Sequence, residues 1–315
     1  PAGPRHGDLV SALSAPVPPA DAESLHELSV GVWPVSVARA SGDGLTQRSL
    51  VAAGVDVRDL AEQFGTPLYV LDEVDFRARA AAFREAYQDD EIPGQVYYAG
   101  KAFLSATTLR WLEQEGLNLD VCSGGELALA LRAGFPANRI SFHGNNKSHE
   151  EIDAAVTAGV SSFVIDSYEE IVRVADAAHR HDRVVDVLVR VTVGVEAHTH
   201  EFIATAHEDQ KFGLSLTSGA AAEAVRRIVK LPSLKLVGLH SHIGSQIFDA
   251  SGFEVAAHRV VGLAAAIRDA TGHVIDELNL GGGMGVAYVS GDDPLEVTAM
   301  SQQIHDIVRA ESSAA

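Results

Sequence analysis

Residues 117–134 read LNLDVCSGGELALALRAG, and the prediction of the fold starts from this stretch. A short apolar run, Leu117–Val121, ends in small and polar residues, and a longer amphipathic segment, Glu126–Ala133, follows it. The first run is too short for a helix and is typical of a buried strand, whereas the second has helical spacing. The stretch therefore predicts one strand followed by one helix.

The same unit recurs on both sides of this stretch. Seven strands are predicted: Val96–Ala99, Leu117–Val121, Ile140–His143, Phe163–Asp166, Val187–Val191, Leu236–His242 and Glu277–Leu280. The helices predicted between and after them include Ser105–Glu115, Glu126–Ala133, Ser148–Ala158, Ser167–His181, Ala220–Val229 and Gly252–Ala270. Apolar strands that alternate with helices are typical of a parallel sheet buried on both faces. The candidates are a (β/α)8 barrel and an open, doubly wound sheet.

Polar and glycine residues at the carboxyl ends of the strands distinguish these two folds. Such residues follow nearly every strand: Lys101, Ser123–Glu126, His143–Asn146, Asp166, Arg190, His240–His242 and Gly281–Gly283. A barrel gathers all its strand ends around one mouth, whereas an open sheet uses only the strands near its switch point. We therefore predict an α/β barrel over residues 56–315, with seven of its eight strands found. Residues 1–55 lack periodicity and are predicted to form a partly irregular N-terminal extension.

The composition restricts the partners. Of the 315 residues, 46% are hydrophobic, and the formal net charge is -19. A surface this acidic repels nucleic acids and anionic lipids, so small molecules or other protein chains are the expected partners. The single cysteine, Cys122, excludes an internal disulfide and favours a reducing compartment. No apolar run reaches the ~18 residues of a membrane span. We expect a cytoplasmic protein.

Two features at the predicted mouth suggest covalent and phosphate chemistry. Lys101 follows an apolar strand directly, where a lysine can act as a Schiff-base nucleophile, although a solvated lysine would look the same. Gly281-Gly282-Gly283-Met284-Gly285 follows the last strand, and successive glycines let backbone N–H groups converge on a phosphate. The glycine run does not match the spacing of a dinucleotide site.

The histidines of the preceding strand allow three interpretations. His240 and His242 alternate with Ser241, so both are expected to point to one face of the strand. They could fill the barrel interior, or they could bind a metal together with His143, Asp166, His198 and His200. We prefer a third interpretation, in which His242 stacks on a flat cofactor and Ser245 reaches its phosphate, and we predict no metal.

The carboxylates near Lys101 could support catalysis. Asp120 and Glu126 flank the segment from Cys122 to Gly125, and carboxylates beside a catalytic lysine can orient it and move protons. Alternatively, Glu126 only caps the following helix. Nothing in the sequence activates Cys122, so we interpret it as a packing residue rather than a nucleophile.

Several long motifs follow one another along the chain: Tyr98-Ala99-Gly100-Lys101-Ala102-Phe103-Leu104, Leu119-Asp120-Val121-Cys122-Ser123-Gly124-Gly125-Glu126, His143-Gly144-Asn145-Asn146-Lys147, Glu196-Ala197-His198-Thr199-His200-Glu201, His207-Glu208-Asp209-Gln210-Lys211-Phe212-Gly213, His240–Gln246 and Leu280-Gly281-Gly282-Gly283. Their sequences and their order resemble those of diaminopimelate decarboxylases, most closely the actinobacterial members, and the resemblance covers residues from about Trp33 onward. These enzymes are fold-type III decarboxylases that use pyridoxal 5'-phosphate (PLP) in an alanine-racemase-like barrel.

The resemblance implies a role for each matching residue. Lys101 would form the internal aldimine, and His242 would stack on the pyridine ring. Ser245, Gly281, Gly282 and Gly283 would hold the phosphate, while Asp120, Glu126 and Arg190 would line the site. The implied reaction is the decarboxylation of meso-2,6-diaminopimelate to L-lysine, the last step of lysine biosynthesis, in which PLP is the electron sink.

The resemblance also implies parts that this sequence does not contain. The family continues with a Glu-Pro-Gly-Arg strand and a C-terminal β-domain that completes a homodimeric active site. We therefore expect the chain to be part of a longer protein and to need the remaining part for activity. Two alternatives are a fold-type III decarboxylase of ornithine, arginine or carboxynorspermidine, and a non-catalytic PLP-binding fragment.

Overall fold

The computed structural model describes residues 28, 31–40, 49–195, 211–289, 291–292 and 296–315. The chain divides into two compact units, one comprising residues 1–75 and 287–292 and the other residues 76–286 and 293–315. The helix α3 (Glu73–Ala86) begins in the first unit and lies mostly in the second.

The first unit contains a small antiparallel sheet and one short helix. The strands β1 (Val37–Arg39), β2 (Leu50–Ala52) and β3 (Val55–Asp56) pair in that order. The helix α2 (Val57–Phe64) follows directly, and the Asp56 side chain caps it by accepting a hydrogen bond from the Arg58 N–H. A short polar residue at this position satisfies a backbone donor that the first helical turn leaves unpaired.

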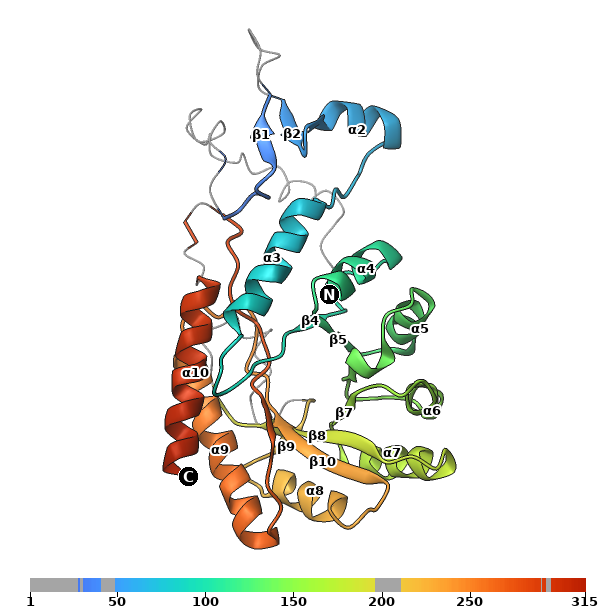
Figure 1. Cartoon of the computed structure of the whole chain (residues 1–315), viewed down its shortest axis with the longest axis vertical. Coiled ribbons are helices and arrows are strands. Elements are labelled where there is room, and N and C mark those ends of the chain that lie inside the picture. Colours follow the sequence, from blue (N-terminus) through green and yellow to red (C-terminus); the bar gives the residue numbers. More distant parts are fainter. Residues whose placement is uncertain (1–27, 29–30, 41–48, 196–210, 290, 293–295) are drawn as a thin grey trace, which may run out of the picture. The chain divides into compact units, whose positions relative to one another are not determined.

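The second unit is built from the predicted alternation of strands and helices (Figure 1). Its elements are β4 (Tyr97–Ala99), α4 (Ala106–Gln114), β5 (Asn118–Val121), α5 (Gly124–Arg132), η2 (Ala137–Arg139), β6 (Ile140–Phe142), α6 (His149–Ala158), β7 (Ser162–Ile165), α7 (Tyr168–Arg180), β8 (Val185–Thr192), β9 (Leu214–Ser215), α8 (Ala220–Ile228), β10 (Leu234–His240), α9 (Ser251–Thr271), β11 (Glu277–Asn279) and α10 (Val297–Ala314).

The strand order confirms the barrel and excludes the doubly wound sheet. Strands pair in the order β4-β5-β6-β7-β8-β10-β11, each parallel to the next, while the two-residue β9 pairs with the end of β8. A doubly wound sheet reverses its order at a switch point, whereas this order runs in one direction only. Burial raises the pKa of Tyr97 on β4, and Glu277 on β11 raises it further, so the two edge strands lie within electrostatic reach.

Two apolar clusters lie on opposite faces of the curved sheet. The larger one packs the outer face against the helices and includes Leu119, Phe142 and Ile165. In Figure 1, helices α4 to α8 lie along this outer side. The smaller cluster contains only Val164, Leu188 and Val237. Because neighbouring residues of a strand point to opposite faces, this second cluster lies inside the barrel.

The last helix packs on both α9 and the segment that precedes β4. The Ser301 hydroxyl donates to the Ala86 carbonyl at 2.6 Å, and the His305 ring lies 5.8 Å from the Tyr87 ring. Arg309 forms ion pairs with Asp89 and Glu91. Helix α10 therefore contacts both the segment before the first barrel strand, β4, and the helix before the last one, α9.

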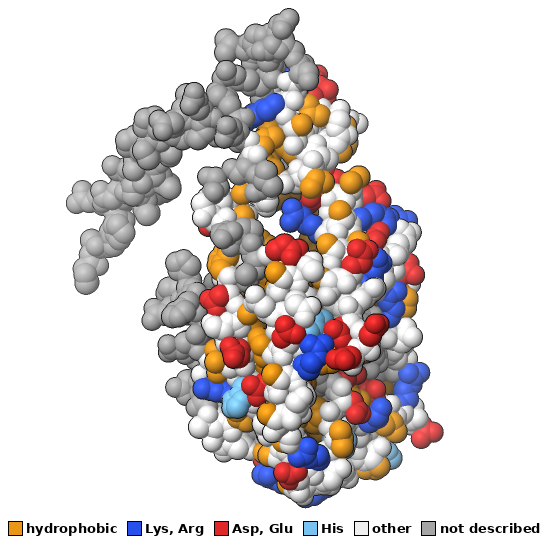
Figure 2. Space-filling view, turned by 60° about the vertical axis from the view of Figure 1, so that its left-hand side comes forward, with side chains coloured by type: hydrophobic (Ala, Val, Ile, Leu, Met, Phe, Trp, Pro, Cys, Tyr) orange, Lys and Arg blue, Asp and Glu red, His pale blue; other side chains and the backbone are white. Residues whose placement is uncertain are grey.

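The surface carries charges of both signs. Figure 2 shows acidic and basic side chains interspersed with apolar ones on one face of the molecule. None of the helices in the described ranges is long and apolar enough to cross a membrane.

Candidate active site at the carboxyl ends of the strands

The structure places all the predicted site residues at the carboxyl edge of the sheet. Lys101 lies two residues beyond β4, Asp120 lies near the end of β5, and Arg190 lies in the last part of β8. His242 and Ser245 follow β10, and the glycine run follows β11. Their catalytic and binding roles remain predictions, but residues far apart in the sequence share one edge.

Lys101 is solvent-exposed and lies on a tight turn. The Gly100 N–H donates to the Asp120 carbonyl at 2.8 Å, and the Ala102 N–H donates to the Ala99 carbonyl at 3.0 Å. A Cβ atom on Gly100 would lie 2.8 Å from the Asp120 carbonyl oxygen, so the turn needs glycine at this position. The positive charge of Lys101 adds to the burial that lowers the pKa of His242 and partly opposes the burial that raises the pKa of Cys122, so the lysine lies within electrostatic reach of both side chains.

His242 is held neutral by its surroundings. Burial lowers the pKa of its imidazole to about 4, with smaller contributions from the positive charges of Arg190, Lys101 and His143. Because an uncharged imidazole is easily desolvated, this ring can lie against a flat ligand without a buried charge.

The low pKa of His242 predicts a loss of stability in mild acid. The unfolded chain, with a histidine pKa of ~6.5, binds this proton before the folded chain does, so stability falls as the pH falls from 6.5 toward 4. We expect this residue to contribute a decrease of about 2 kcal/mol in the free energy of unfolding between pH 7 and pH 5. Urea unfolding at both pH values measures it. His242→Phe keeps a flat ring and should show a smaller decrease, and an unchanged pH dependence in this variant would contradict the assignment.

The glycines after β11 form a cradle in close contact with the segment after β10. Gly281 and Gly283 have φ values of +74° and +99°, which favour glycine. A Cβ atom on Gly281 would lie 2.8 Å from Nδ1 of His242, and one on Gly283 would lie 2.0 Å from the Gly244 carbonyl oxygen and 3.2 Å from Cα of Ser245. Thus His242, Ser245 and the glycine run belong to one site.

Gly283→Ala should therefore be much more damaging than Gly282→Ala. The unfavourable φ alone is expected to cost about 1–3 kcal/mol, and the overlap with Gly244 adds to this. A Cβ atom on Gly282 meets nothing within 4 Å, so that variant should change the free energy of unfolding by less than about 0.5 kcal/mol. Urea unfolding of both variants tests the cradle, and equal losses would contradict it.

A ring of polar side chains lies below the mouth, on the inner face of the barrel. It consists of Asp120, His143, Asp166, Arg190 and His240, which lie on or directly after the neighbouring strands β5, β6, β7, β8 and β10. Nε2 of His143 lies 3.2 Å from Oδ1 of Asp120, and the rings of His143 and His240 meet edge to face at 5.0 Å. Nε of Arg190 lies 3.8 Å from Oδ1 of Asp166. The inner face near the mouth is therefore polar.

Glu126 binds the segment that contains Cys122. Its Oε2 atom accepts a hydrogen bond from the Cys122 N–H at 2.7 Å, and its Oε1 atom lies 3.7 Å from Sγ. Partial burial of the thiol, followed by the Glu126 charge, raises the pKa of Cys122 to about 11. The thiol is thus protonated at neutral pH, although Cys122 is exposed rather than packed inside.

Lys147 and Glu170 form a buried ion pair just beyond the carboxyl ends of β6 and β7, and no sequence pattern predicts it. The Lys147 ammonium, with a side chain 1% exposed, donates to the carbonyls of Gly144 and Val164 at 2.8 and 2.7 Å and to the Glu170 carboxylate. Oε2 of Glu170 accepts from the Asp166 N–H at 2.7 Å. Lys147 ends the motif His143-Gly144-Asn145-Asn146-Lys147, but no local sequence pattern distinguishes a buried lysine from an exposed one.

The metal alternative gains no support. His198 and His200 lie outside the described residues. Within the described ranges, no group of three or more histidine, cysteine, aspartate or glutamate side chains could hold a metal ion.

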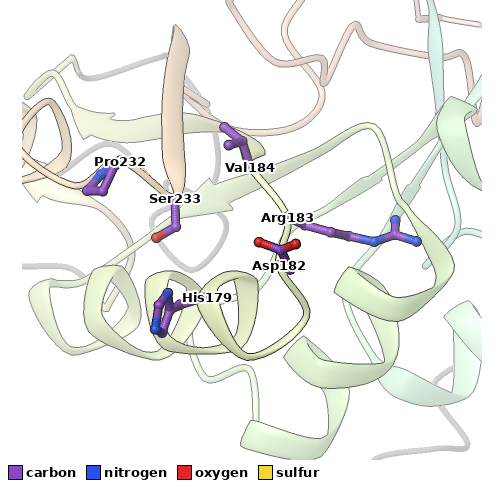
Figure 3. Close-up of a pocket in the computed structure, with 6 residues that line it drawn as sticks. All are labelled: His179, Asp182, Arg183, Val184, Pro232 and Ser233. Carbon is purple, nitrogen blue, oxygen red and sulfur yellow. The ribbon is translucent and has the colours of Figure 1, made fainter.

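A hollow at the opposite end of the sheet is separate from this site. Figure 3 shows its lining, which comes from the last turn of α7 and from the connections that precede β8 and β10: His179, Asp182, Arg183, Val184, Pro232 and Ser233. Active sites of barrels lie at the carboxyl ends of the strands, so we assign this hollow no role in catalysis.

Comparisons with known proteins converge on one family. The family model described as "Pyridoxal-dependent decarboxylase, pyridoxal binding domain" matches residues 73–314. A diaminopimelate decarboxylase of Mycobacterium leprae is 50% identical over 320 aligned positions, covering 99% of this chain and 66% of that protein. One of Bacillus subtilis is 44% identical, covering 84% of this chain and 60% of that protein.

A solved structure has the same fold. The diaminopimelate decarboxylase of M. jannaschii, in complex with L-lysine, superposes with a TM-score of 0.80 and 30% sequence identity. The superposition covers 89% of this chain and 64% of that one. The chain thus spans 66% or less of the length of each of these three proteins.

Proposed function

The chain belongs to the pyridoxal-dependent decarboxylase family, and we propose that within it this chain carries the cofactor-binding barrel of a diaminopimelate decarboxylase. The observation that supports this most directly is that Lys101 lies at the same edge of the sheet as a neutral His242 and the glycine cradle, with its charge within reach of the imidazole. The names of the relatives support diaminopimelate as the substrate, and the neighbouring structure in complex with L-lysine fits lysine as the product. The motif from Glu196 to Gly213 favours this substrate over ornithine or arginine, although most of it lies outside the described residues.

The residues at the mouth fit PLP. The cradle of Gly281–Gly283 has no room for side chains at Gly281 or Gly283, and its backbone can approach a phosphate closely. Several buried polar atoms at the same edge have no well-oriented hydrogen-bond partner among the described residues, including Oδ1 of Asp120 and Nδ1 of His240. Such atoms suit a site in which a polar ligand completes the hydrogen bonding.

Each predicted site residue would have a distinct role. The Lys101 amine would bind the cofactor covalently, since it is exposed and lies at a fixed strand end. His242 would cover one face of the flat ring, and Ser245 with the glycine N–H groups would hold the phosphate. Asp120, Glu126 and Arg190 would supply charges around Lys101.

In the proposed reaction the carboxylate at the D-centre of meso-diaminopimelate leaves as carbon dioxide, and one proton takes its place. Bound PLP supplies the electron sink for this step. The protein would orient the scissile bond so that its electrons can pass to the cofactor. It would also keep other proton donors away from the reacting carbon. Burial of Arg190 and Asp166 beside the mouth provides fixed charges in a largely dehydrated setting, where they act more strongly than in water.

We further propose that the complete enzyme is a cytoplasmic homodimer and that the barrel domain begins near residue 56. The acidic composition and the single cysteine support the location. Light scattering of the purified protein measures the oligomeric state.

A PLP titration followed by a panel of amino acids tests the proposal. The chain is titrated with PLP, treated with borohydride and digested, and we expect a phosphopyridoxyl group on Lys101 by mass mapping. The PLP-loaded chain is then mixed with meso-diaminopimelate, ornithine or arginine. We expect meso-diaminopimelate to change the cofactor absorbance at the lowest concentration. A stronger response to ornithine would reverse the assignment of the substrate, and an adduct on another lysine would contradict the site.

A further inference from the structure

Three buried polar atoms meet inside the barrel without well-oriented hydrogen bonds. They are Oδ1 of Asp120, Nε2 of His143 and Nδ1 of His240. The first two lie only 3.2 Å apart, and the two histidine rings are in edge-to-face contact at 5.0 Å. Since buried polar atoms in folded proteins are almost always paired, this cluster calls for an explanation, and no role assigned so far involves His143.

The distance between Asp120 and His143 is that of a hydrogen bond, and only the orientation is unfavourable. A small rotation of either side chain would complete the bond. An ionised carboxylate can only accept, so the bond requires a proton on Nε2 of His143. Within the described ranges, no other cationic side chain lies within ion-pairing distance of Asp120.

His240 supports this arrangement without competing for the carboxylate. Its side chain is 4% exposed, and burial is the largest cause that holds its pKa well below the usual value, with a further contribution from the positive charge of Arg190. The ring therefore stays neutral and packs against His143. The Asn279 side chain hydrogen-bonds the His240 ring and also accepts from the Gly281 N–H at 2.9 Å, which links the pair to the glycine cradle.

We propose that His143 is a positioning residue whose Nε2–H holds one oxygen of Asp120 and so orients the carboxylate beside Lys101. Asp120 is the register neighbour of Ala99, two residues before Lys101, so its orientation affects the charge beside that amine. The inference rests on the proposed function, because Asp120 matters here only if the cofactor is bound at Lys101. The other charged or titratable groups near the histidine pair are Asp166, Arg190, His242 and Lys101.

The tautomer of His143 can be measured in the chain without PLP. Nitrogen NMR of a histidine-labelled sample, assigned with His143→Gln, reports which ring nitrogen carries the proton. We expect the proton on Nε2, and we expect this signal to shift in Asp120→Asn. A proton on Nδ1, or a signal that does not respond to Asp120→Asn, would overturn the inference.

Two substitutions of similar size separate positioning from packing. A glutamine at 143 places its amide nitrogen near the position of Nε2, whereas an asparagine places it near Nδ1. We expect His143→Asn to weaken PLP binding about tenfold in an absorbance titration, and His143→Gln to weaken it less than about threefold. In an Asp120→Asn background, His143→Asn should cause no further loss.

Equal losses in the two variants, or full additivity with Asp120→Asn, would overturn the inference. His179→Gln, at the exposed opposite end of the barrel, is the control and should bind PLP as the unsubstituted chain does. If the unsubstituted chain attached no PLP to Lys101, the proposed function would fail, and the tautomer measurement alone would decide the role of His143.

Discussion

Replacing Lys101 with alanine is expected to abolish the covalent attachment of PLP to the chain. The borohydride-treated variant should show no phosphopyridoxyl peptide, because Lys101 lies two residues beyond β4 and its charge reaches His242, which contacts the glycine cradle. Lys101→Arg keeps the positive charge but offers no comparable nucleophile, so it should also fail. Intact mass and peptide mapping after borohydride treatment measure the result.

The control for this experiment is a lysine of similar exposure outside the site. Lys230→Ala, just beyond α8, should retain the full yield of the adduct on Lys101. Reversible PLP binding should persist in Lys101→Ala with reduced affinity, since the phosphate cradle is intact. A variant that still carried one phosphopyridoxyl group would show that another lysine is the nucleophile and would refute the assignment.

The second large effect is expected at Lys147, whose removal should destabilise the whole barrel. Lys147→Met leaves the Glu170 carboxylate, only 5% exposed, buried without its counter-charge. Breaking a buried pair in this way typically costs about 3–5 kcal/mol. Urea unfolding at pH 7 should therefore show a decrease of about this size in the free energy of unfolding.

The double variant Lys147→Met/Glu170→Leu tests the cause. Replacing both members of a buried pair with apolar side chains removes the uncompensated charge, so much of the lost stability should return. Recovery will be incomplete, because Glu170 also accepts a hydrogen bond from the Asp166 backbone. If the double variant were as unstable as the single one, packing at Lys147 rather than charge would be the cause.

Hydrophobic periodicity predicted the barrel strands well. The run Val187–Val191 lies inside β8 (Val185–Thr192), and Leu117–Val121 differs from β5 (Asn118–Val121) by a single residue. Strands of this kind are buried on both faces, so their composition alone marks them. The strands β1 to β3 and β9 were not predicted, because each has only two or three residues and, unlike the equally short β4, β6 and β11, lies outside the regular alternation of strands and helices.

The location of the candidate site residues at one edge of the sheet was predictable, but their contacts were not. Lys101, His242 and the glycines could be named because strand ends in a barrel share one mouth. The contact between His143 and Asp120 depends on the stagger between β5 and β6, and the burial of Lys147 depends on the packing of α7. Both contacts depend on the tertiary structure and cannot be predicted from the sequence of a single strand or loop.

The position of helix α10 has a consequence for folding during synthesis. Its contacts with residues 86–91 join positions 215 to 220 residues apart in the chain. At a translation rate of about 5–20 residues per second, the early segment waits about 10–40 seconds for its partner to leave the ribosome. During that interval residues 86–91 lack these contacts. The nascent chain is therefore more exposed to misassembly around this segment until α10 emerges.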